Sequence, residues 1–138
     1  MTPSARGRNP FEVYLLAVVV LAGLAVLGGW AEPTSIERAL HGPLRLLWAC
    51  LITFGGACSL LGVLWRWRPL TGLFVQRAGV VMAGCGTAAY SVAAFALGAP
   101  GVSVGLYNAG FAAACLVRGI QLQRTLHAAR RAADNLRG

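Results

Sequence analysis

The chain has 138 residues, of which 57% are hydrophobic and 12% are charged, and its formal net charge is +8. An ordinary soluble domain is about 45–50% apolar and about 25% charged. The composition therefore excludes a disordered chain and disfavours a soluble globule, and the length predicts a single domain. All twelve basic residues are arginines, and the four acidic residues are Glu12, Glu32, Glu37 and Asp134.

Four apolar stretches predict helices that cross a membrane. In chain order they are residues 13–30, 46–65, 78–97 and 102–117. A helix needs roughly 20 apolar residues to cross a bilayer core of about 30 Å. None of the stretches carries the polar stripe that a soluble helical bundle would show. The turn Gly98-Ala99-Pro100-Gly101 predicts a tight hairpin between the last two stretches. We expect an all-α, polytopic membrane protein that forms one membrane domain over residues 1–138.

The first stretch also has the layout of a secretory signal. Arg6 and Arg8 precede it, and Gly29-Trp30-Ala31 offers a weak cleavage site. Its apolar run is longer than the roughly 7–15 residues usual for a signal, which favours a retained helix. Cleavage of the first span stays open at this point.

The distribution of the arginines predicts the topology. Ten of the twelve lie in the N-terminal arm, between the second and third stretches, or in the C-terminal tail: Arg6, Arg8, Arg66, Arg68, Arg77, Arg118, Arg124, Arg130, Arg131 and Arg137. The positive-inside rule then places both termini on the cytoplasmic side of a bacterial inner membrane. There the arginines favour anionic lipids. They also account for the basic charge without a nucleic-acid partner.

The cytoplasmic segments predict a surface for the membrane or for a partner protein. Residues 118–138 leave the bilayer but favour helix, so we expect a basic amphipathic helix that continues the fourth span, with Gly119 as a bend. A self-associating tail is the alternative, because the residues with a/d coiled-coil spacing are Leu122, Leu126, Ala129, Ala133 and Leu136. The expected surface residues are Trp65, Arg66, Trp67, Arg68, Arg77, Arg118, Arg124, Arg130 and Arg131.

On the outer side the sequence predicts a short surface helix and aromatic anchors. The capping-box pattern Thr34-Ser35-Ile36-Glu37 predicts a helix through Leu40. Aromatic residues near span ends are typical of interfacial anchors, and here they are Tyr14, Trp30, Trp48, Trp65 and Trp67.

The sequence indicates no catalytic, cofactor or metal site. The four cysteines lie inside predicted spans, where we expect them to act as small apolar residues. His41 and His127 are expected on opposite sides of the membrane and cannot share a metal. Small multidrug exporters have about this length and four helices, but they carry a carboxylate well inside the first helix. Here Glu12 lies at the cytoplasmic edge, so we do not expect a protein of that family. Because no catalytic, cofactor or metal site is indicated, we do not expect an enzyme either.

Small residues at four-residue spacing predict helix contacts in the third and fourth stretches. Helices associate in a membrane through small residues and polar side chains, because lipid tails are as apolar as leucine. We expect the two stripes to face each other or a neighbouring subunit. They are Gly79, Ala83, Thr87 and Ser91 in the third stretch, and Gly101, Gly105, Ala109 and Ala113 in the fourth.

Asn108 is the one strongly polar side chain near the centre of a predicted span. Its amide needs a hydrogen-bond partner, because hydrocarbon offers none. The expected partner is Thr87 or a carbonyl of the same chain. A ring of Asn108 amides between subunits, or a wet path, is the alternative. Together with the small-residue stripes, Asn108 predicts a homo-oligomer.

Two short motifs carry a resemblance to a known group. Asn9-Pro10-Phe11-Glu12-Val13-Tyr14-Leu15-Leu16 precedes the first span, and Trp67-Arg68-Pro69-Leu70-Thr71-Gly72-Leu73-Phe74-Val75-Gln76-Arg77-Ala78-Gly79 lies between the second and third. Both resemble small membrane proteins of actinobacterial phages and prophages, some of which are regarded as holin-like. The resemblance implies a phage setting and a host inner membrane, and it supplies no active-site residues.

Three functions stay open on the sequence. A holin-like protein that self-associates and permeabilises the membrane fits the small-residue stripes. A membrane-resident interaction protein, such as a superinfection-exclusion factor or an assembly anchor, would use residues 65–77 and the tail to bind a phage or host membrane protein. A small channel or transporter is disfavoured, because no span has a polar face or a titratable residue at its middle.

Overall fold

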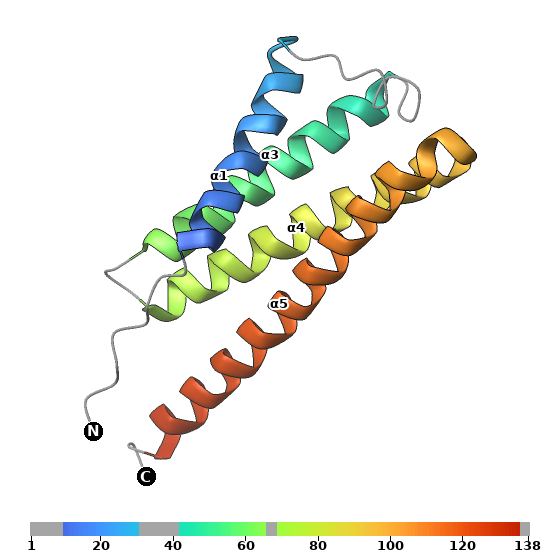
Figure 1. The fold of residues 1–138 in the computed structure, drawn as a ribbon. Coiled ribbons are helices and arrows are strands. Elements are labelled where there is room, and N and C mark those ends of the chain that lie inside the picture. Colours follow the sequence, from blue (N-terminus) through green and yellow to red (C-terminus); the bar gives the residue numbers. More distant parts are fainter. Residues whose placement is uncertain (1–9, 31–41, 66–68, 136–138) are drawn as a thin grey trace.

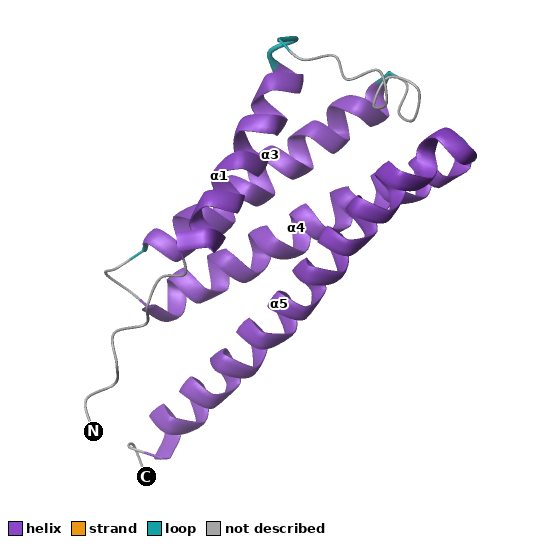
Figure 2. Ribbon diagram, in the orientation of Figure 1, coloured by secondary structure: helices purple, strands orange, loops and turns teal. Residues whose placement is uncertain are grey.

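The computed structural model describes residues 10–30, 42–65 and 69–135, and these residues form helices and short turns without a strand (Figure 2). The long helices are α1 (Pro10–Leu27), α3 (Pro43–Leu64), α4 (Pro69–Ala96) and α5 (Val102–Asn135). The short 3-10 helix η1 (Ala99–Gly101) connects α4 to α5. All four long helices are long and apolar enough to cross a membrane. The all-α fold and the four predicted apolar helices are therefore confirmed.

Proline and glycine set the helix boundaries. Proline is the first residue of α1, α3 and α4, where its missing N–H leaves no hydrogen bond unmade and its fixed φ suits a helix. Gly98 follows α4 with a φ of 73°, in the left-handed region that glycine adopts without strain. The predicted hairpin is thus formed by Gly98 and η1.

Helices α4 and α5 extend well past the stretches expected to span. Helix α4 begins at Pro69 rather than at residue 78, so most of the loop expected over residues 65–77 is the first part of α4. Helix α5 continues to Asn135 without a break, so Gly119 does not end the helix. At a rise of about 1.5 Å per residue, the two helices are about 42 and 51 Å long, against about 30 Å for a bilayer core.

The helices are arranged in chain order. Helix α1 packs on α3, α3 on α4, and α4 on α5 (Figure 1). Helix α1 begins at the same end of the structure at which α5 ends, and we call it the Glu12 end (Figure 1). The opposite end, where η1 joins α4 to α5, is the Gly98 end. Because four long helices follow one another in this order, the start of α1 and the end of α5 lie on the same side of the structure.

A small aromatic core near the Gly98 end joins the four helices. Val26, Ala49 and Tyr90 are buried there, and Trp48, Ala93 and Val104 pack against them. The rings of Trp48 and Tyr90 lie 5.3 Å apart between centroids, at a tilt of 43°. Trp48 was expected to be an interfacial anchor, but its indole N–H is shielded and meets no acceptor among the described residues. The side chain packs against Tyr90 in this core instead.

The contact between α3 and α4 is close enough for the two backbones to touch. A Cβ atom added at Gly55 would lie 2.6 Å from the backbone nitrogen of Ala83, and one added at Gly79 would collide with the backbone nitrogen of Ser59. Farther along, a Cβ atom at Gly62 would collide with the backbone of Gln76. Small residues on both helices therefore permit this contact.

This contact corrects the expected partner of the third stripe. Gly79 and Ala83 were expected to face the fourth stretch or another subunit, but both lie against α3. The difference arises because α3 has its own small residues, Gly55, Ser59 and Gly62, spaced to match them. Spacing in α4 alone does not reveal which neighbour the stripe meets.

Replacing Gly55 by valine tests the backbone contact. The new side chain has no room beside Ala83, so we expect the free energy of unfolding to fall by about 1–3 kcal/mol, the usual cost of overpacking. Denaturant titration of the purified protein in detergent measures this change. The matched control is Gly110→Val on α5, because a Cβ atom added at Gly110 meets nothing within 4 Å. Equal stability of the two variants would contradict the contact.

Candidate functional site

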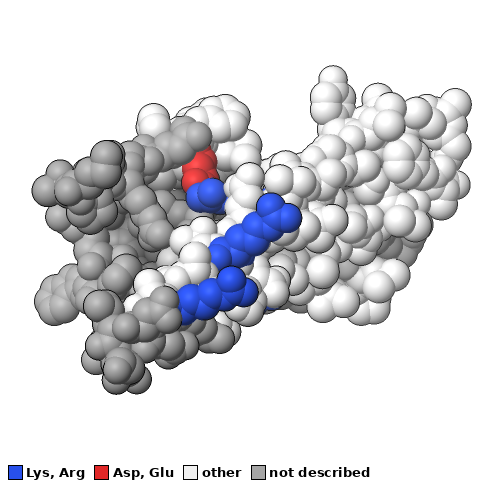
Figure 3. All heavy atoms as spheres, turned by 90° about the horizontal axis from the view of Figure 1, so that it is seen from below, with Lys and Arg blue, Asp and Glu red and all other residues white. Residues whose placement is uncertain are grey.

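A cluster of polar side chains joins three helices at the Glu12 end. Arg118 of α5 donates from Nε to Oε1 of Glu12 at 3.0 Å and from Nη2 to Oε2 at 2.8 Å. Gln76 of α4 donates from Nε2 to the same Oε1 at 2.8 Å. Seen from this end, an acidic group lies against a basic one, with further basic side chains nearby (Figure 3). We call Glu12, Gln76 and Arg118 the Glu12 cluster.

Glu12 has favourable electrostatic contacts in the cluster. Glu12 lies in the first turn of α1, where the helix dipole stabilises negative charge. Arg118 meets it with a two-pronged, charge-assisted contact, which is the strong kind of ion pair. The side chains of Arg118 and Glu12 are 40% and 24% exposed, so solvent weakens the attraction. Gln76 is 4% exposed and closes the buried side.

Gln76 connects the ion pair to the contact between α3 and α4. Its backbone carbonyl accepts a hydrogen bond from the hydroxyl of Ser59 at 3.4 Å. Its backbone also lies directly against Gly62. The residue that supports Glu12 is thus held by a close backbone contact between α3 and α4.

The Glu12 cluster links the first described helix to the last. Both carboxylate oxygens of Glu12 already accept hydrogen bonds from Arg118, and one also accepts from Gln76. Helices α1 and α5 have few other contacts with each other, because α1 packs mainly on α3 and α5 mainly on α4. The ion pair therefore fastens the first helix to the last.

The sequence analysis identified Glu12 and Arg118 but did not pair them. The two residues are 106 positions apart in the chain. The sequence did contain a signal for this pair, because Glu12 is a lone acidic residue at the edge of the first predicted span and Arg118 directly follows the fourth. The predicted topology puts these edges on the same side. Gln76 was not identified as a site residue, since it lay in a segment expected to be a loop.

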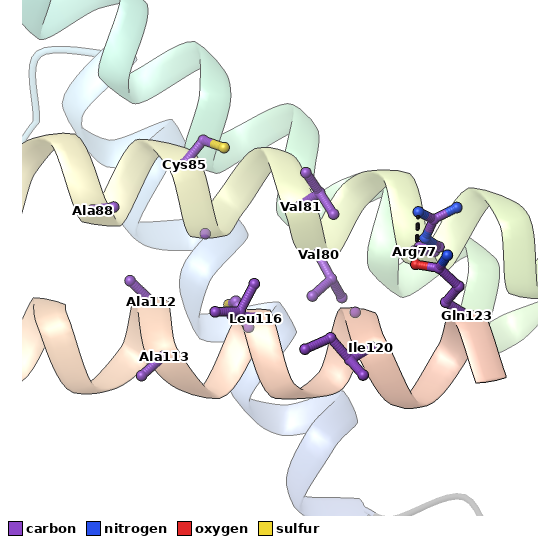
Figure 4. Close-up of a pocket in the computed structure, with 13 residues that line it drawn as sticks. Arg77, Val80, Val81, Cys85, Ala88, Ala112, Ala113, Leu116, Ile120 and Gln123 are labelled. Atoms are coloured by element: carbon purple, nitrogen blue, oxygen red, sulfur yellow. Dashed lines mark hydrogen bonds between the residues drawn. The ribbon is translucent and has the colours of Figure 1, made fainter. Parts of the chain in front are cut away.

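A second feature is a groove of about 440 Å³ between α4 and α5. It is lined by small and apolar side chains along most of its length (Figure 4). At the Glu12 end it is bordered by Arg77 and Gln123, and Arg77 Nη2 donates to Gln123 Oε1 at 3.2 Å. Cys85 and Cys115 lie along the groove as free thiols.

The remaining residues of the two small-residue stripes lie mostly between α4 and α5. The Ser91 hydroxyl donates to the carbonyl of Gly105 at 2.8 Å. Gly101 lies directly against the carbonyl of Ala94, and Gly105 lies under the ring of Phe95. Thr87 is buried and donates to carbonyls of its own helix. Ala109 is half-buried, and Ala113 is exposed on the groove. The stripes thus meet near the Gly98 end only.

Asn108 donates from Nδ2 to the carbonyl of Val104 in its own helix at 2.9 Å. Its side chain is half-buried on α5. Thr87, the other partner considered, is engaged elsewhere. Within the described residues this is the amide's one hydrogen bond.

The expected surface residues fall into three groups. Trp65, Arg124 and Arg131 are exposed, whereas Arg77 and Arg118 are half-buried and hydrogen-bonded. Arg66, Trp67 and Arg68, the short helix expected over residues 34–40, and Leu136 lie outside the described residues. Arg130 belongs to α5, but its side chain is likewise not described. Leu122 and Leu126 are buried within the chain, so they are not available for the self-associating tail that was the alternative.

Comparison of the chain with protein families, with curated proteins and with solved structures finds no match. Among the described residues, no three His, Cys, Asp or Glu side chains come together as metal ligands would.

A double-mutant cycle measures the ion pair between Glu12 and Arg118. We expect Glu12→Gln and Arg118→Gln each to lower the free energy of unfolding, and the double variant to lose less than the sum. The coupling energy should be about 1–2 kcal/mol, between values for exposed and buried pairs. Denaturant titration in detergent gives these values.

Exchanging the two charges provides the control for this cycle. In the variant Glu12→Arg/Arg118→Glu, the Gln76 amide can turn its oxygen toward the new arginine. Most of the lost stability should therefore return. A coupling near zero would show that the ion pair contributes nothing to the fold.

Proposed function

We propose that the protein is a multi-pass protein of the bacterial inner membrane, with cytoplasmic termini, which self-associates and permeabilises the membrane as phage holins do. The membrane location is supported by the four long apolar helices. The orientation is supported by the ten arginines of the N-terminal arm, of the segment between the second and third stretches and of the C-terminal tail. The phage setting rests on the resemblance of the two motifs that precede the first and third spans.

Asn108 is the observation that carries self-association. It lies midway along the part of α5 expected in the bilayer, and α5 has the least buried of the four candidate spans, at 11%. One amide N–H bonds to Val104, which leaves the second N–H and the carbonyl oxygen without a described partner. Hydrocarbon provides none, so an unpaired amide there lowers stability. A second α5 can provide the missing donor and acceptor.

The buried polar side chains of a single copy favour a water path that lies between copies rather than within one. Thr53, Thr87 and Ser91 are buried, and each hydroxyl donates to a backbone carbonyl. They therefore do not form a polar lining within the described helices. A water-filled path needs polar groups along its wall, so it would have to form where several copies meet.

A second candidate function is supported by the length of α4 and α5. Both helices exceed the thickness of a bilayer core, so their ends at the Glu12 end would project into the cytoplasm. Arg124 and Arg131 are exposed on this projection. A membrane-resident interaction protein, serving superinfection exclusion or assembly, would use this surface to bind a phage or host protein.

Inducible expression with a dye that reports membrane potential tests the proposed function. We expect the wild-type chain to collapse the potential abruptly and Asn108→Leu to leave it intact at equal membrane levels. Asn108→Gln keeps an amide and should retain activity. Leu106→Ala changes an exposed residue of the same helix and serves as the control.

The size of the protein in mild detergent provides the second readout. Wild type should form oligomers and Asn108→Leu should form monomers. An oligomer unchanged by Asn108→Leu would contradict the role of the amide. Normal growth and potential during wild-type expression, together with resistance to phage infection, would favour the interaction protein.

A further inference from the structure

The groove between α4 and α5 has the dimensions of one membrane leaflet. On α4 its lining residues extend from Arg77 to Ala88, which at about 1.5 Å per residue is about 16 Å. Half of a bilayer core of about 30 Å is about 15 Å. The groove thus begins at the polar pair Arg77 and Gln123 and ends near the middle of the expected bilayer. Figure 4 shows this pair at one end and Ala88 and Ala112 toward the other.

The groove exists because small residues do not fill the space between the two helices. Helices α4 and α5 approach closely at Ser91 and Gly105 and then diverge toward the Glu12 end (Figure 1). A Cβ atom added at Gly119 would meet only Val81, at 3.8 Å. An unfilled apolar groove forfeits dispersion contacts along its walls. An acyl chain restores these contacts, since it is long, thin and apolar.

Charge identifies the headgroup that would accompany the chain. Arg77 has one hydrogen bond in the structure, to Gln123, and no acidic partner among the described residues. The carboxylate of Glu12 is already bound by Arg118 and Gln76. The guanidinium of Arg77 therefore retains donors in a planar fork that matches phosphate oxygens. An anionic phospholipid provides the missing negative charge.

The same charges disfavour a second copy of the chain as the occupant. A second copy inserted in the same orientation would bring its own Arg77 to this level of the membrane and Arg124 close to it. These cations would not supply the negative charge that Arg77 lacks. An anionic lipid brings the opposite charge to the same place.

We propose that this groove binds one acyl chain of an anionic phospholipid from the leaflet at the Glu12 end, with the phosphate on Arg77. The site requires the membrane location proposed above but not self-association. A monomeric protein would therefore still bind the lipid.

Native mass spectrometry of the full chain, released from detergent with added lipid, tests the site. Phosphatidylglycerol and phosphatidylcholine of equal chain length are the probes. We expect one phosphatidylglycerol to be retained per copy, about tenfold in preference to phosphatidylcholine. Arg77→Gln should remove this preference. Arg124→Gln removes the same charge from the same end but outside the groove, and should keep it.

Filling the groove tests the position of the acyl chain. Gly119→Leu should lower retention of both lipids, and the matched control Gly110→Leu, on the open face of α5, should not. If Gly119→Leu does not fold, Gly119→Ala adds one methyl group with room to spare and should lower retention less. Helical circular dichroism and melting in detergent check the fold of each variant.

Three results would overturn the proposal. If Arg77→Gln and Arg124→Gln lose the preference for phosphatidylglycerol equally, the Glu12 end attracts anions in general and the groove is not a specific site. Equal retention of the two lipids by the wild type would remove the role of the phosphate. A change of oligomer size in Gly119→Leu with unchanged lipid retention would show that the groove is a contact between copies. Failure of the Asn108 experiments alone would leave the lipid result unaffected.

Discussion

A polar group placed in hydrocarbon must find its partner within the protein, and this constraint explains how the polar side chains of the described helices are arranged. The hydroxyls of Thr53 and Thr87 bond to carbonyls of their own helices, and the hydroxyl of Ser91 reaches across to α5. The carboxylate of Glu12 is fully engaged at one end of the structure. Two groups depart from this pattern: the shielded indole N–H of Trp48, and Asn108, whose second N–H and carbonyl oxygen have no described partner. The departure at Asn108 is the reason we propose a contact between copies there.

Small residues have two different effects in this chain. Between α3 and α4 they allow the backbones to touch, which makes this pair the closely packed centre of the arrangement. Between α4 and α5 they bring the helices together at Ser91 and Gly105 and again at Gly84 and Cys115, and they leave a groove along this contact. The outer helices α1 and α5 each pack mainly on one neighbour, and the Glu12 cluster ties them together. The Glu12 cluster thus adds a polar link between the outer helices to the packing of each helix on its neighbour.

Hydropathy, proline and glycine were enough to predict the number, order and approximate limits of the helices. The continuation of the fourth span into a helical tail was also correctly predicted. The helical conformation of residues 69–77 was not predicted, because this segment was taken as a loop before the third span, although a helix can continue through Arg77 into water. The expected neighbour was right for Ser91, which meets Gly105, and wrong for Gly79 and Ala83, because spacing identifies a face of a helix and does not identify its partner.

The candidate sites depended on contacts that the sequence alone does not reveal. The pairing of Glu12 with Arg118 joins the first helix to the last, so no local pattern contains it. The groove arises from the divergence of α4 and α5, which depends on the packing of all four helices. Asn108 was identifiable in advance, since a single amide in an apolar stretch is conspicuous in any sequence.

The side of the membrane on which each end of the structure lies tests the account most directly. In a chain that carries Asn108→Leu, which we expect to leave the membrane sealed, and whose four cysteines are replaced by alanine, single cysteines at Ala99 and Ala128 would mark the two ends, and both positions are exposed. Labelling of intact spheroplasts with a membrane-impermeant maleimide should modify the cysteine at 99, and should modify that at 128 only after the membrane is opened. Modification of both positions from outside, or of 128 alone, would contradict four crossings with cytoplasmic ends.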